Sequence, residues 1–461
     1  MNTFRRIAVL DIGKTNAKVV VVDCHSGEEV AQRRISNDVV KGPPYCHYDT
    51  DALWSFICGC LAEFAGVPGY DGISVTTHGA AAALIDSNGN LCLPVIDYEE
   101  CYPFEISQTY DRLRPAFHET FSPRLAGGLN LGAQIHYQKT AFADAFSRVK
   151  TIITYPQYWA FRLSGVAANE VTSLGCHTDL WLPREKRYSS LVDNLEIGSL
   201  MAPVRSAFDM LGETTSEISE VCRLSHPVPV FCGIHDSNAS LLPHLRTHTL
   251  PFAVVSTGTW MINFAVGGNL EQLDPRRDCL ANVDANGRAV ASSRFMGGRE
   301  FECLTKELGP FNPQAAQATI PNVIDRSMMM LPNLAMGSGP YPGVTRRWIN
   351  DGSATNIDRW AAACLYFSLM TDTCLELINA QGPVLIEGPF SHNPAFLTVL
   401  RDLVGRDVLA MRGVTGTAQG AALLAGISSV PQEHVPVTRK HISGLTDYRR
   451  AWRNLAWNMS S

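Results

Sequence analysis

Two places in this chain, one near the start of each half, combine short apolar runs with a tight polar turn that contains glycine and threonine. In the first half the apolar runs are residues 7–11 and 18–23, and in the second half they are residues 252–256 and 260–266. Apolar runs joined by such a turn are typical of β-hairpins. Because the arrangement occurs twice, we predict two α/β lobes that each open with a hairpin, divided as residues 1–246 and 247–461.

Length and composition argue against several classes of protein. The 461 residues are enough for two or three domains, and 38 Lys and Arg against 44 Asp and Glu give a net charge of −6. A broad basic surface for nucleic acid is therefore not expected. No apolar run reaches the roughly 20 residues that span a bilayer. With no signal-like leader, and with 13 scattered cysteines that form no CxxC pair, we expect a cytoplasmic protein with reduced thiols and no metal cluster.

The remaining patterns predict helices and strands between and after the hairpins. We expect residues 97–225 to be helical and loop-rich. In residues 357–380, Trp360, Cys364, Phe367, Cys374 and Ile378 fall on one stripe, which is typical of an amphipathic helix. The other predicted helices are 51–65, 238–242, 395–404 (capped by Asn393) and 417–425, and the other predicted strands are 29–35, 72–77, 80–85, 91–96, 228–232, 384–386 and 408–411.

The first turn, residues 11–16 (DIGKTN), offers groups that suit polyphosphate. Backbone N–H groups, hydroxyl and amide donors gather there, Gly13 permits close approach, and Lys14 or Lys18 adds positive charge. Asp11 fits if it holds Mg²⁺, which prefers a carboxylate together with substrate oxygens. The same turn is also compatible with a capped hairpin and a solvated lysine. Residues 256–259 (STGT) repeat this chemistry in the second half.

Asp236 is the candidate catalytic carboxylate. It follows an apolar strand in residues 233–238 (GIHDSN) and opens an apparent helix, where it can accept a proton from an alcohol nucleophile. The simpler alternative is that Asp236 or Ser237 caps the helix. His244 and His248 have i,i+4 spacing, but Pro243 argues against a helix there, so we predict no metal site at these histidines.

Several common motifs are absent. The chain has no GxxxxGK[ST] sequence and no GxGxxG after its first strand, which argues against P-loop and Rossmann nucleotide binding. It also has no GxSxG elbow of serine hydrolases.

The ordered set of motifs resembles the FGGY carbohydrate kinases nearly from end to end. The set comprises residues 11–16, 233–236, 256–259, 387–390 (EGPF) and 416–422 (GTAQGAA). The resemblance implies an α/β fold of two ribonuclease-H-like (actin-like ATPase) lobes with an interlobe active-site cleft. The N-terminal lobe would bind mainly sugar and carry the catalytic Asp, and the C-terminal lobe would bind mainly ATP.

The resemblance also implies residue roles. Asp236 matches the base that deprotonates the sugar hydroxyl, and Asp11, with Asp236, is expected at the Mg²⁺. The residues expected on the nucleotide side are Asp11, Gly13, Lys14, Thr15, Asn16, Lys18, Thr257, Gly258, Thr259, Gly388, Pro389, Ser391, Asn393 and Gln419. Those expected to contact sugar are His78, Gly79, Ala80, Tyr98, Glu99 and Asp236.

The chain departs from the family pattern in three places. Glu387 and Pro389 replace two glycines of the adenosine motif, which leaves the adenine contacts open. Residues 77–80 (THGA) differ from the patterns of several well-known branches, and the acid expected among residues 97–100 (DYEE) is not assignable to one residue. The segment 170–173 (EVTS) borders the sugar pocket in the family, but core packing and capping explain it equally well.

We therefore expect an ATP-dependent kinase acting on a ketose, with the first turn closest to the L-fuculose and L-rhamnulose kinases. A 6-deoxyketohexose is the leading substrate and a pentulose the next. The expected partners are sugar, ATP and Mg²⁺, without nucleic acid or membrane, and a homodimer is the assembly to consider. The alternatives are a catalytically silent sugar or nucleotide sensor on the same fold and, further off, an actin-like chaperone or filament protein.

Overall fold

The computed structural model describes residues 4–334, 337–412, 416–427 and 433–458. Its contacts divide the chain into two compact units. The first unit contains residues 4–247, and the short segments 281–289 and 416–427 of the second half belong to it as well. The second unit contains the rest of the described chain. A single division after residue 246 therefore does not describe how the chain is shared between the units.

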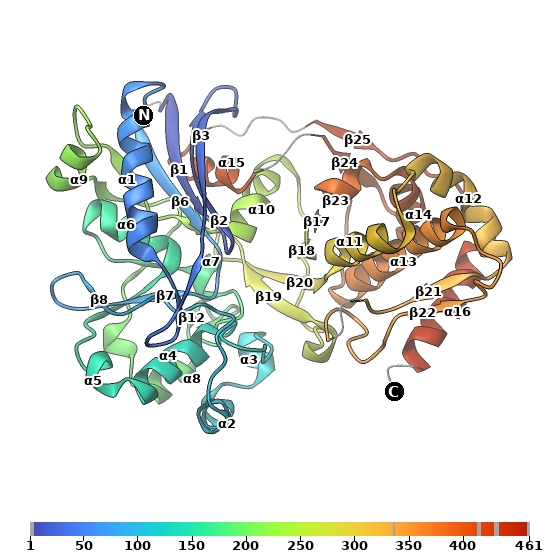
Figure 1. Cartoon of the computed structure of the whole chain (residues 1–461), viewed down its shortest axis with the longest axis horizontal. Coiled ribbons are helices and arrows are strands. Elements are labelled where there is room, and N and C mark those ends of the chain that lie inside the picture. Colours follow the sequence, from blue (N-terminus) through green and yellow to red (C-terminus); the bar gives the residue numbers. More distant parts are fainter. Residues whose placement is uncertain (1–3, 335–336, 413–415, 428–432, 459–461) are drawn as a thin grey trace. The chain divides into compact units, whose positions relative to one another are not determined.

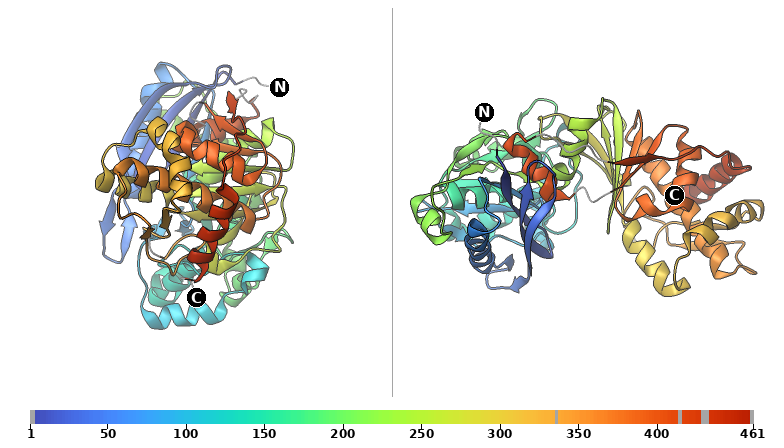
Figure 2. Two further views of the ribbon diagram at one scale, coloured as in Figure 1. Left: turned by 90° about the vertical axis from the view of Figure 1, so that its right-hand side faces the viewer. Right: turned by 90° about the horizontal axis from the view of Figure 1, so that it is seen from above.

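The first unit is built on a mixed sheet with helices on both faces (Figures 1 and 2). Its strand order is β14-β15-β6-β1-β2-β3, with β16 paired to β6. The strands are β1 (Arg6–Ile12), β2 (Asn16–Asp23), β3 (Glu29–Ser36), β6 (Gly72–Thr77), β14 (Met210–Glu213), β15 (Pro229–Phe231) and β16 (Ile234–His235). The helices against this sheet include α1 (Thr50–Gly66), α6 (Tyr155–Ser164), α10 (Asp236–Thr247) and α15 (Thr417–Ala422).

The alternation of side chains along β1 explains why the sheet is covered on both faces. Ala8, Leu10 and Ile12 join the hydrophobic cluster that contains residues of α1 and α6. Ile7 and Val9 join the cluster that contains Ala239 of α10 and the small residues of α15. Successive strand residues point to opposite faces, so the run IAVLDI supplies two cores at once.

The rest of the first unit is a helical and loop-rich layer around a small sheet, β8-β7-β9. Its strands are β4 (Val39–Lys41), β5 (Cys46–Tyr48), β7 (Ala82–Ile85), β8 (Leu91–Leu93), β9 (Thr151–Thr154), β10 (Asn169–Glu170), β11 (Trp181–Leu182), β12 (Arg187–Tyr188) and β13 (Val204–Arg205). Its helices are α2 (Phe104–Leu113), α3 (Phe117–Thr120), α4 (Leu131–Ala141), α5 (Ala143–Phe146), α7 (Val171–Leu174), α8 (Ser190–Asn194) and α9 (Ser216–Val221).

The second unit repeats the plan with a sheet of order β19-β20-β18-β17-β23-β24-β25. Its strands are β17 (Phe252–Thr257), β18 (Met261–Val266), β19 (Cys279–Val283), β20 (Ala289–Phe295), β21 (Met329–Leu331), β22 (Arg347–Ile349), β23 (Val384–Glu387), β24 (Val408–Met411) and β25 (His434–Pro436), although residues 281–283 of β19 and Ala289 of β20 fall in the first unit. Its helices are α11 (Gly297–Leu308), α12 (Pro313–Asp325), α13 (Asn356–Leu377), α14 (Pro394–Val404) and α16 (Leu445–Asn458).

The two predicted hairpins are confirmed, and they have the same place in their sheets. β1 pairs antiparallel with β2 and parallel with β6, and β17 pairs antiparallel with β18 and parallel with β23. Each sheet has three antiparallel strands, then parallel ones, and an antiparallel strand at the far edge (β14 or β25), which agrees with the ribonuclease-H-like fold that the family resemblance implied.

Two helix predictions were wrong in detail. α10 does not end before Pro243 but continues to Thr247, with Pro243 and His244 buried inside it. α13 is not amphipathic, since every residue from Trp360 to Leu375 is buried. It runs through the middle of its unit, where helices, aromatic side chains and the sheet surround it, so no polar face is required.

The structure bears on two expectations, that the cysteines are reduced and that no segment is apolar enough to span a bilayer. All 13 cysteines are free, and nine of them are buried. Among the described residues, no helix is both long and apolar enough to cross a membrane.

Candidate active site

Asp236 stands at the start of α10, directly after β16. The chain reaches this position through Gly233, whose φ of +88° and whose approach to the Val75 carbonyl leave no room for a side chain, since a Cβ there would lie 2.8 Å from that oxygen. Asp236 Oδ1 accepts hydrogen bonds from the Ser237 N–H at 2.6 Å and from the Ser237 hydroxyl at 3.3 Å. The Asp236 side chain retains 30% exposure. Its carboxylate is thus held by its own helix and stays accessible on one side.

Two carboxylates share this region of the first unit. Burial raises the pKa of Asp236, while the Ser237 hydrogen bonds and, when it is protonated, the charge of His78 oppose the rise. Burial also raises the pKa of Asp11, which is 8% exposed, and the negative charge of Asp236 raises it further, against the opposing charge of Lys18. Because the charge of Asp236 disfavours the ionised form of Asp11, a cation placed beside both carboxylates would be favoured.

Two buried histidines face the carboxylates in the neutral form, because burial lowers the pKa of His78 and of His235 to about 4. His235 Nε2 lies 3.2 Å from Asp236 Oδ1, and its Nδ1 lies 3.3 Å from the Asn238 amide nitrogen. The amide nitrogen donates to Nδ1, so Nε2 carries the proton and donates to Asp236.

His78 has the opposite tautomer. Its Nδ1 lies 2.8 Å from the Gly79 carbonyl and donates to it, which leaves Nε2 as an acceptor. In the described part of the chain, this buried Nε2 has no hydrogen-bond partner. A buried acceptor without a partner is costly, and a hydroxyl group of a ligand would satisfy it.

The segment after β6 is shaped by backbone constraints as well as by His78. A Cβ at Gly79 would lie 2.8 Å from His235 Nε2, so only glycine fits between the two histidines. Ala80 has a φ of +54°, and its carbonyl accepts a hydrogen bond from Gln134 at 2.5 Å. Tyr98 lies with its ring centroid 5.5 Å from that of His78. The predicted sugar-contacting residues His78, Gly79, Ala80 and Tyr98 thus lie in one neighbourhood.

Lys14 points toward that neighbourhood. Its ammonium forms an ion pair with Asp97, lies 3.6 Å from Glu99 Oε2, and stands 5.3 and 5.0 Å from the ring centroids of Tyr48 and Tyr98. Asp97 is buried, whereas the Glu99 side chain is 70% exposed. Of Asp97 and Glu99, Asp97 is thus the buried acid that pairs with Lys14 next to Tyr48 and Tyr98.

The other polar groups of the first turn, in Gly13, Thr15 and Asn16, form hydrogen bonds with one another. The Gly13 N–H donates to the Asn16 carbonyl at 2.9 Å, and the Asn16 amide donates to the Thr15 hydroxyl at 2.9 Å. Lys18 Nζ lies 3.4 Å from Asp11 Oδ2 and 3.6 Å from Glu29 Oε1. Of the two lysines, Lys18 is the one that neutralises Asp11.

The helix α15 completes the surroundings of Asp11, which the sequence did not reveal. The Thr417 hydroxyl donates to Asp11 Oδ2. A Cβ at Gly420 would lie 1.8 Å from the Ala239 carbonyl, so α15 and α10 are in close backbone contact. Gln419, predicted on the nucleotide side, lies on this helix of the first unit. The small-residue run TAQGAA was a signal for close packing but gave no indication of its partner.

In the second unit, backbone contacts hold the predicted nucleotide residues together. The Thr257 hydroxyl donates to the Glu387 carbonyl and accepts from the Phe390 N–H at 3.1 Å, which ties the turn Thr257, Gly258, Thr259 to the segment after β23. Gly388 has a φ of +75°, and a Cβ there would lie 2.1 Å from the Thr257 carbonyl.

The segment 295–300, to which the sequence analysis assigned no role, packs against the second turn. It opens α11, and a Cβ at Gly298 would lie 1.9 Å from the Gly258 carbonyl. The Arg299 N–H donates to the Thr259 carbonyl at 3.2 Å.

The residues predicted for the adenosine motif, Pro389, Ser391 and Asn393, shape or hydrogen-bond the backbone of their own segment. Pro389 begins a 3₁₀ helix, Pro389–His392, and the Ser391 hydroxyl donates to the Gly388 carbonyl at 2.8 Å. Asn393 caps α14 by accepting from the Phe396 N–H at 3.2 Å, as predicted. These contacts fix the shape of the backbone next to the second turn.

A buried acid behind Asp236 was not assigned a role from the sequence. Glu170 is fully buried, and burial raises its pKa to about 7. Its Oε2 accepts from the N–H and the hydroxyl of Thr172, and the Thr172 hydroxyl accepts from the His235 N–H at 3.0 Å. Glu170 thus supports the residue that precedes Asp236. No local pattern distinguishes it from an ordinary helix cap.

The residues present fit a Mg²⁺ that takes most of its ligands from a substrate. Among the described residues, no group of three or more His, Cys, Asp and Glu side chains could hold a metal by itself. Asp11, whose pKa is raised by burial and by the charge of Asp236, and Asp236 itself suit an ion bound through one or two carboxylates and phosphate oxygens.

Comparison with known proteins agrees with this architecture. Residues 6–243 match the N-terminal domain of the FGGY family of carbohydrate kinases, and residues 249–434 match the carbohydrate kinase FGGY C-terminal domain. An L-fuculokinase of Salmonella typhi is 23% identical over 273 residues, which cover 58% of this chain and 57% of that protein.

Solved structures of the same fold cover the chain almost completely. A carbohydrate kinase from Novosphingobium aromaticivorans is 33% identical with a TM-score of 0.91, covering 99% of both chains. A xylulose kinase from Rhodospirillum rubrum has a TM-score of 0.82 at 18% identity, again over 99% of both chains, and shows the fold alone. With both halves of the chain matched in order, this protein belongs to the FGGY family of carbohydrate kinases.

Proposed function

We propose that this protein is an ATP-dependent sugar kinase that phosphorylates a terminal hydroxyl of a ketose. The observation that carries the proposal is the pair formed by Asp236 and His78. One is a carboxylate open on one side, with its basicity increased by burial, and the other presents a buried acceptor that needs a hydroxyl donor. Family membership supports phosphoryl transfer as the chemistry to which this pair contributes.

In the proposed reaction, Asp236 accepts the proton of the sugar hydroxyl as its oxygen attacks the γ-phosphorus of ATP. A new oxygen–phosphorus bond forms, the bond to the ADP leaving group breaks, and the proton remains on Asp236 until it passes to solvent. His235 donates a hydrogen bond from its Nε2–H to Asp236 Oδ1 and thereby orients the carboxylate. Bound Mg²⁺ at Asp11 and Asp236 would supply charge neutralisation for the phosphates.

The proposal assigns the sugar to the first unit. His78 Nε2 accepts from one sugar hydroxyl, and Asp97 with Lys14 offers an acceptor and a donor beside the rings of Tyr48 and Tyr98. Aromatic faces next to charged hydrogen-bonding groups suit a molecule with both C–H and O–H surfaces. Glu99, which is mostly exposed, is assigned to the rim of this site.

The nucleotide is assigned chiefly to the turn and segment joined by Thr257 in the second unit. Gly258 and Gly388 have no side chain, so phosphate oxygens can approach the backbone there, and the adjacent Thr259 adds a hydroxyl group. Pro389, Ser391 and Asn393 hold the shape of this surface. Gly13, Thr15, Asn16, Lys18 and Gln419 form the corresponding part of the first unit around Asp11.

Among ketoses we propose a 6-deoxyketohexose such as L-fuculose or L-rhamnulose. The similarity to L-fuculokinases supports this choice over part of the chain. The alternative is a pentulose, which is favoured by the similarity in fold to xylulose kinases.

The test is an ADP-release assay with purified protein, MgATP and a panel of L-fuculose, L-rhamnulose, L-ribulose, D-ribulose and D-xylulose. We expect ADP release that depends on one of these ketoses, with formation of the sugar phosphate. If calorimetry detects sugar binding but no ketose increases ADP release, the protein is a sensor and the proposed kinase function is wrong.

A further inference from the structure

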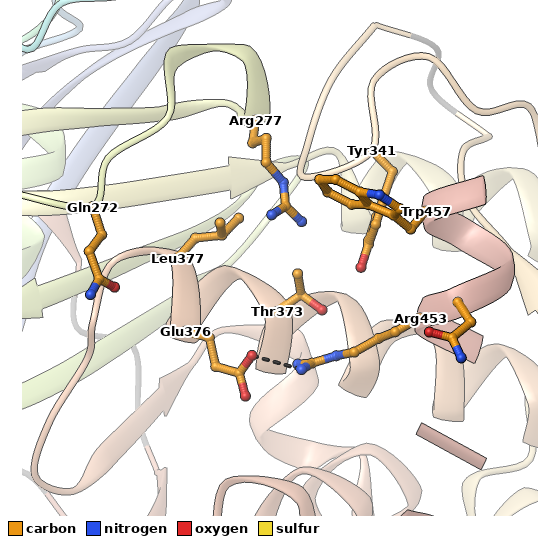
Figure 3. Close-up of a pocket in the computed structure, with 9 residues that line it drawn as sticks. Gln272, Arg277, Tyr341, Thr373, Glu376, Leu377, Arg453 and Trp457 are labelled. Carbon is orange, nitrogen blue, oxygen red and sulfur yellow. Dashed lines mark ion pairs between the residues drawn. The ribbon is translucent and has the colours of Figure 1, made fainter. Parts of the chain in front are cut away.

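A polar pocket of about 360 Å³ lies in the second unit, away from the residues of that unit that are assigned to the nucleotide (Figure 3). Its walls come from the loop that contains Arg277, the carboxyl end of α13 and the C-terminal helix α16. α13 ends at Leu377 and β23 starts at Val384, so the pocket lies near the amino end of that strand. Gly388 follows the carboxyl end of β23, roughly 13 Å along a four-residue strand. The pocket and the nucleotide residues are therefore separate features.

The carboxylates in and beneath this pocket are already neutralised by arginines. Asp372, only 2% exposed, lies 2.7 Å from a nitrogen of Arg449 and 2.7 Å from one of Arg453. Glu376 forms ion pairs with the same two arginines, at 2.8 Å in the case of Arg453. Two acids and two arginines make a neutral group, so Glu376 presents little net negative charge to a ligand.

Arg277 is the remaining cation among the residues that line the pocket, and the nearby Asp274 and Asp278 form ion pairs with Arg276 and Arg294. Its Nε donates to the Pro340 carbonyl at 3.0 Å, and its guanidinium lies 5.3 Å from the ring centroids of both Tyr341 and Trp457. Within the described ranges, no carboxylate lies within 4 Å of it. Figure 3 shows the guanidinium directed into the space above Thr373. The tether and the two rings hold it in place, which reduces the entropy lost when a ligand binds.

We propose that this pocket binds a small oxyanion, either a carboxylate or a phosphate, carried on a hydroxylated body, with Arg277 as the anchoring cation. A guanidinium held by its Nε keeps its terminal N–H groups for two parallel hydrogen bonds to such an oxyanion. The amides of Gln272 and Asn454 also line the pocket and can contact hydroxyl groups. The Trp457 ring, 57% exposed, offers an apolar wall beside them.

The experiment measures binding of D-glycerate, glycerol 3-phosphate and neutral glycerol by calorimetry, with the wild-type protein and Arg277→Gln. We expect saturable binding of at least one charged compound, weakened at least tenfold by Arg277→Gln, and no binding of glycerol. The two charged compounds distinguish a carboxylate from a phosphate site. Binding of a phosphate at the nucleotide residues would be unaffected by this substitution.

A second variant guards against a folding defect. Arg277→Lys retains the charge but loses the two parallel hydrogen bonds, so it should fold as the wild type and still bind the anion more weakly. Trp457→Phe should remove any change in tryptophan fluorescence that the anion causes. The proposal is overturned if neither charged compound binds in the millimolar range, or if both arginine variants bind as tightly as the wild type.

Discussion

The two Gly/Thr turns join equivalent pairs of strands, yet different kinds of groups surround them. The first turn lies among charged side chains, with Asp11, Lys14 and Lys18 all in ion pairs or hydrogen bonds with groups from other segments. The second turn is enclosed by backbone, because Gly298 and Gly388 approach the carbonyls of Gly258 and Thr257 too closely for any side chain.

This difference shows how one local pattern can serve two chemical tasks. A turn with charged side chains can position a proton acceptor and a cation, whereas a turn made of close backbone can accommodate an extended, highly charged ligand such as polyphosphate. The duplication thus supplies a scaffold, and the neighbouring segments determine what each copy does. The following predictions test that division.

The largest expected effect is that of removing the Asp236 carboxylate. Asp236→Asn should reduce sugar-dependent ADP release by about a hundred- to ten-thousand-fold, because the amide cannot accept the hydroxyl proton. Circular dichroism should be unchanged. The exposed Asp144→Asn is the control and should retain full activity; comparable activity in Asp236→Asn would remove Asp236 as the base.

The next effect concerns the buried acid behind that carboxylate. The pKa of Glu170 is raised to about 7 in the folded protein, against 4.5 in the unfolded chain, so its ionisation destabilises the fold as the pH rises. The free energy of unfolding of Glu170→Gln, minus that of the wild type, should therefore increase by about 2.5 kcal/mol between pH 5 and pH 8. Urea unfolding at both pH values measures it. A difference independent of pH would mean that Glu170 is fully ionised or fully neutral throughout.

The backbone-built turn should be sensitive to a single methyl group. Gly388→Ala should raise the KM for ATP about tenfold or more, since the new Cβ displaces the Thr257 carbonyl and the residue loses its favoured conformation at a φ of +75°. Gly352→Ala, with nothing within 4 Å of the new Cβ, is the matched control and should leave the KM unchanged. An unaltered KM in both variants would argue against this turn as the phosphate site.

The smallest effect should separate the two roles considered for Lys14. If its ion pair with Asp97 belongs to the sugar site, Lys14→Met should raise the KM for the ketose several-fold and leave the KM for ATP unchanged. If instead the KM for ATP rises and the KM for the ketose is unchanged, Lys14 belongs with the residues that contact phosphate. Lys18→Met, beside Asp11, provides the comparison in the same turn.

Much of the fold could be predicted because its signals are local. The strand runs around the two turns, the helix capped by Asn393 and the strands predicted at residues 80–85 and 91–96 all depend on neighbouring residues, and all are confirmed. The buried helix α13 and the continuation of α10 past Pro243 could not be predicted. Their environments are set by segments far away in the chain, which override periodicity and a proline.

The sequence by itself determined the duplicated hairpin architecture, the absence of common nucleotide motifs, and the choice of Asp236 and Asp11 as the carboxylates to consider. Only the tertiary structure decided which side chains face them. Thr417 reaches Asp11 from 406 positions along the chain, Glu170 supports His235 through Thr172, and Gly298 closes on Gly258. Such contacts form where segments that are far apart in the sequence pack closely together. The spacing of residues along the chain does not predict which segments these are.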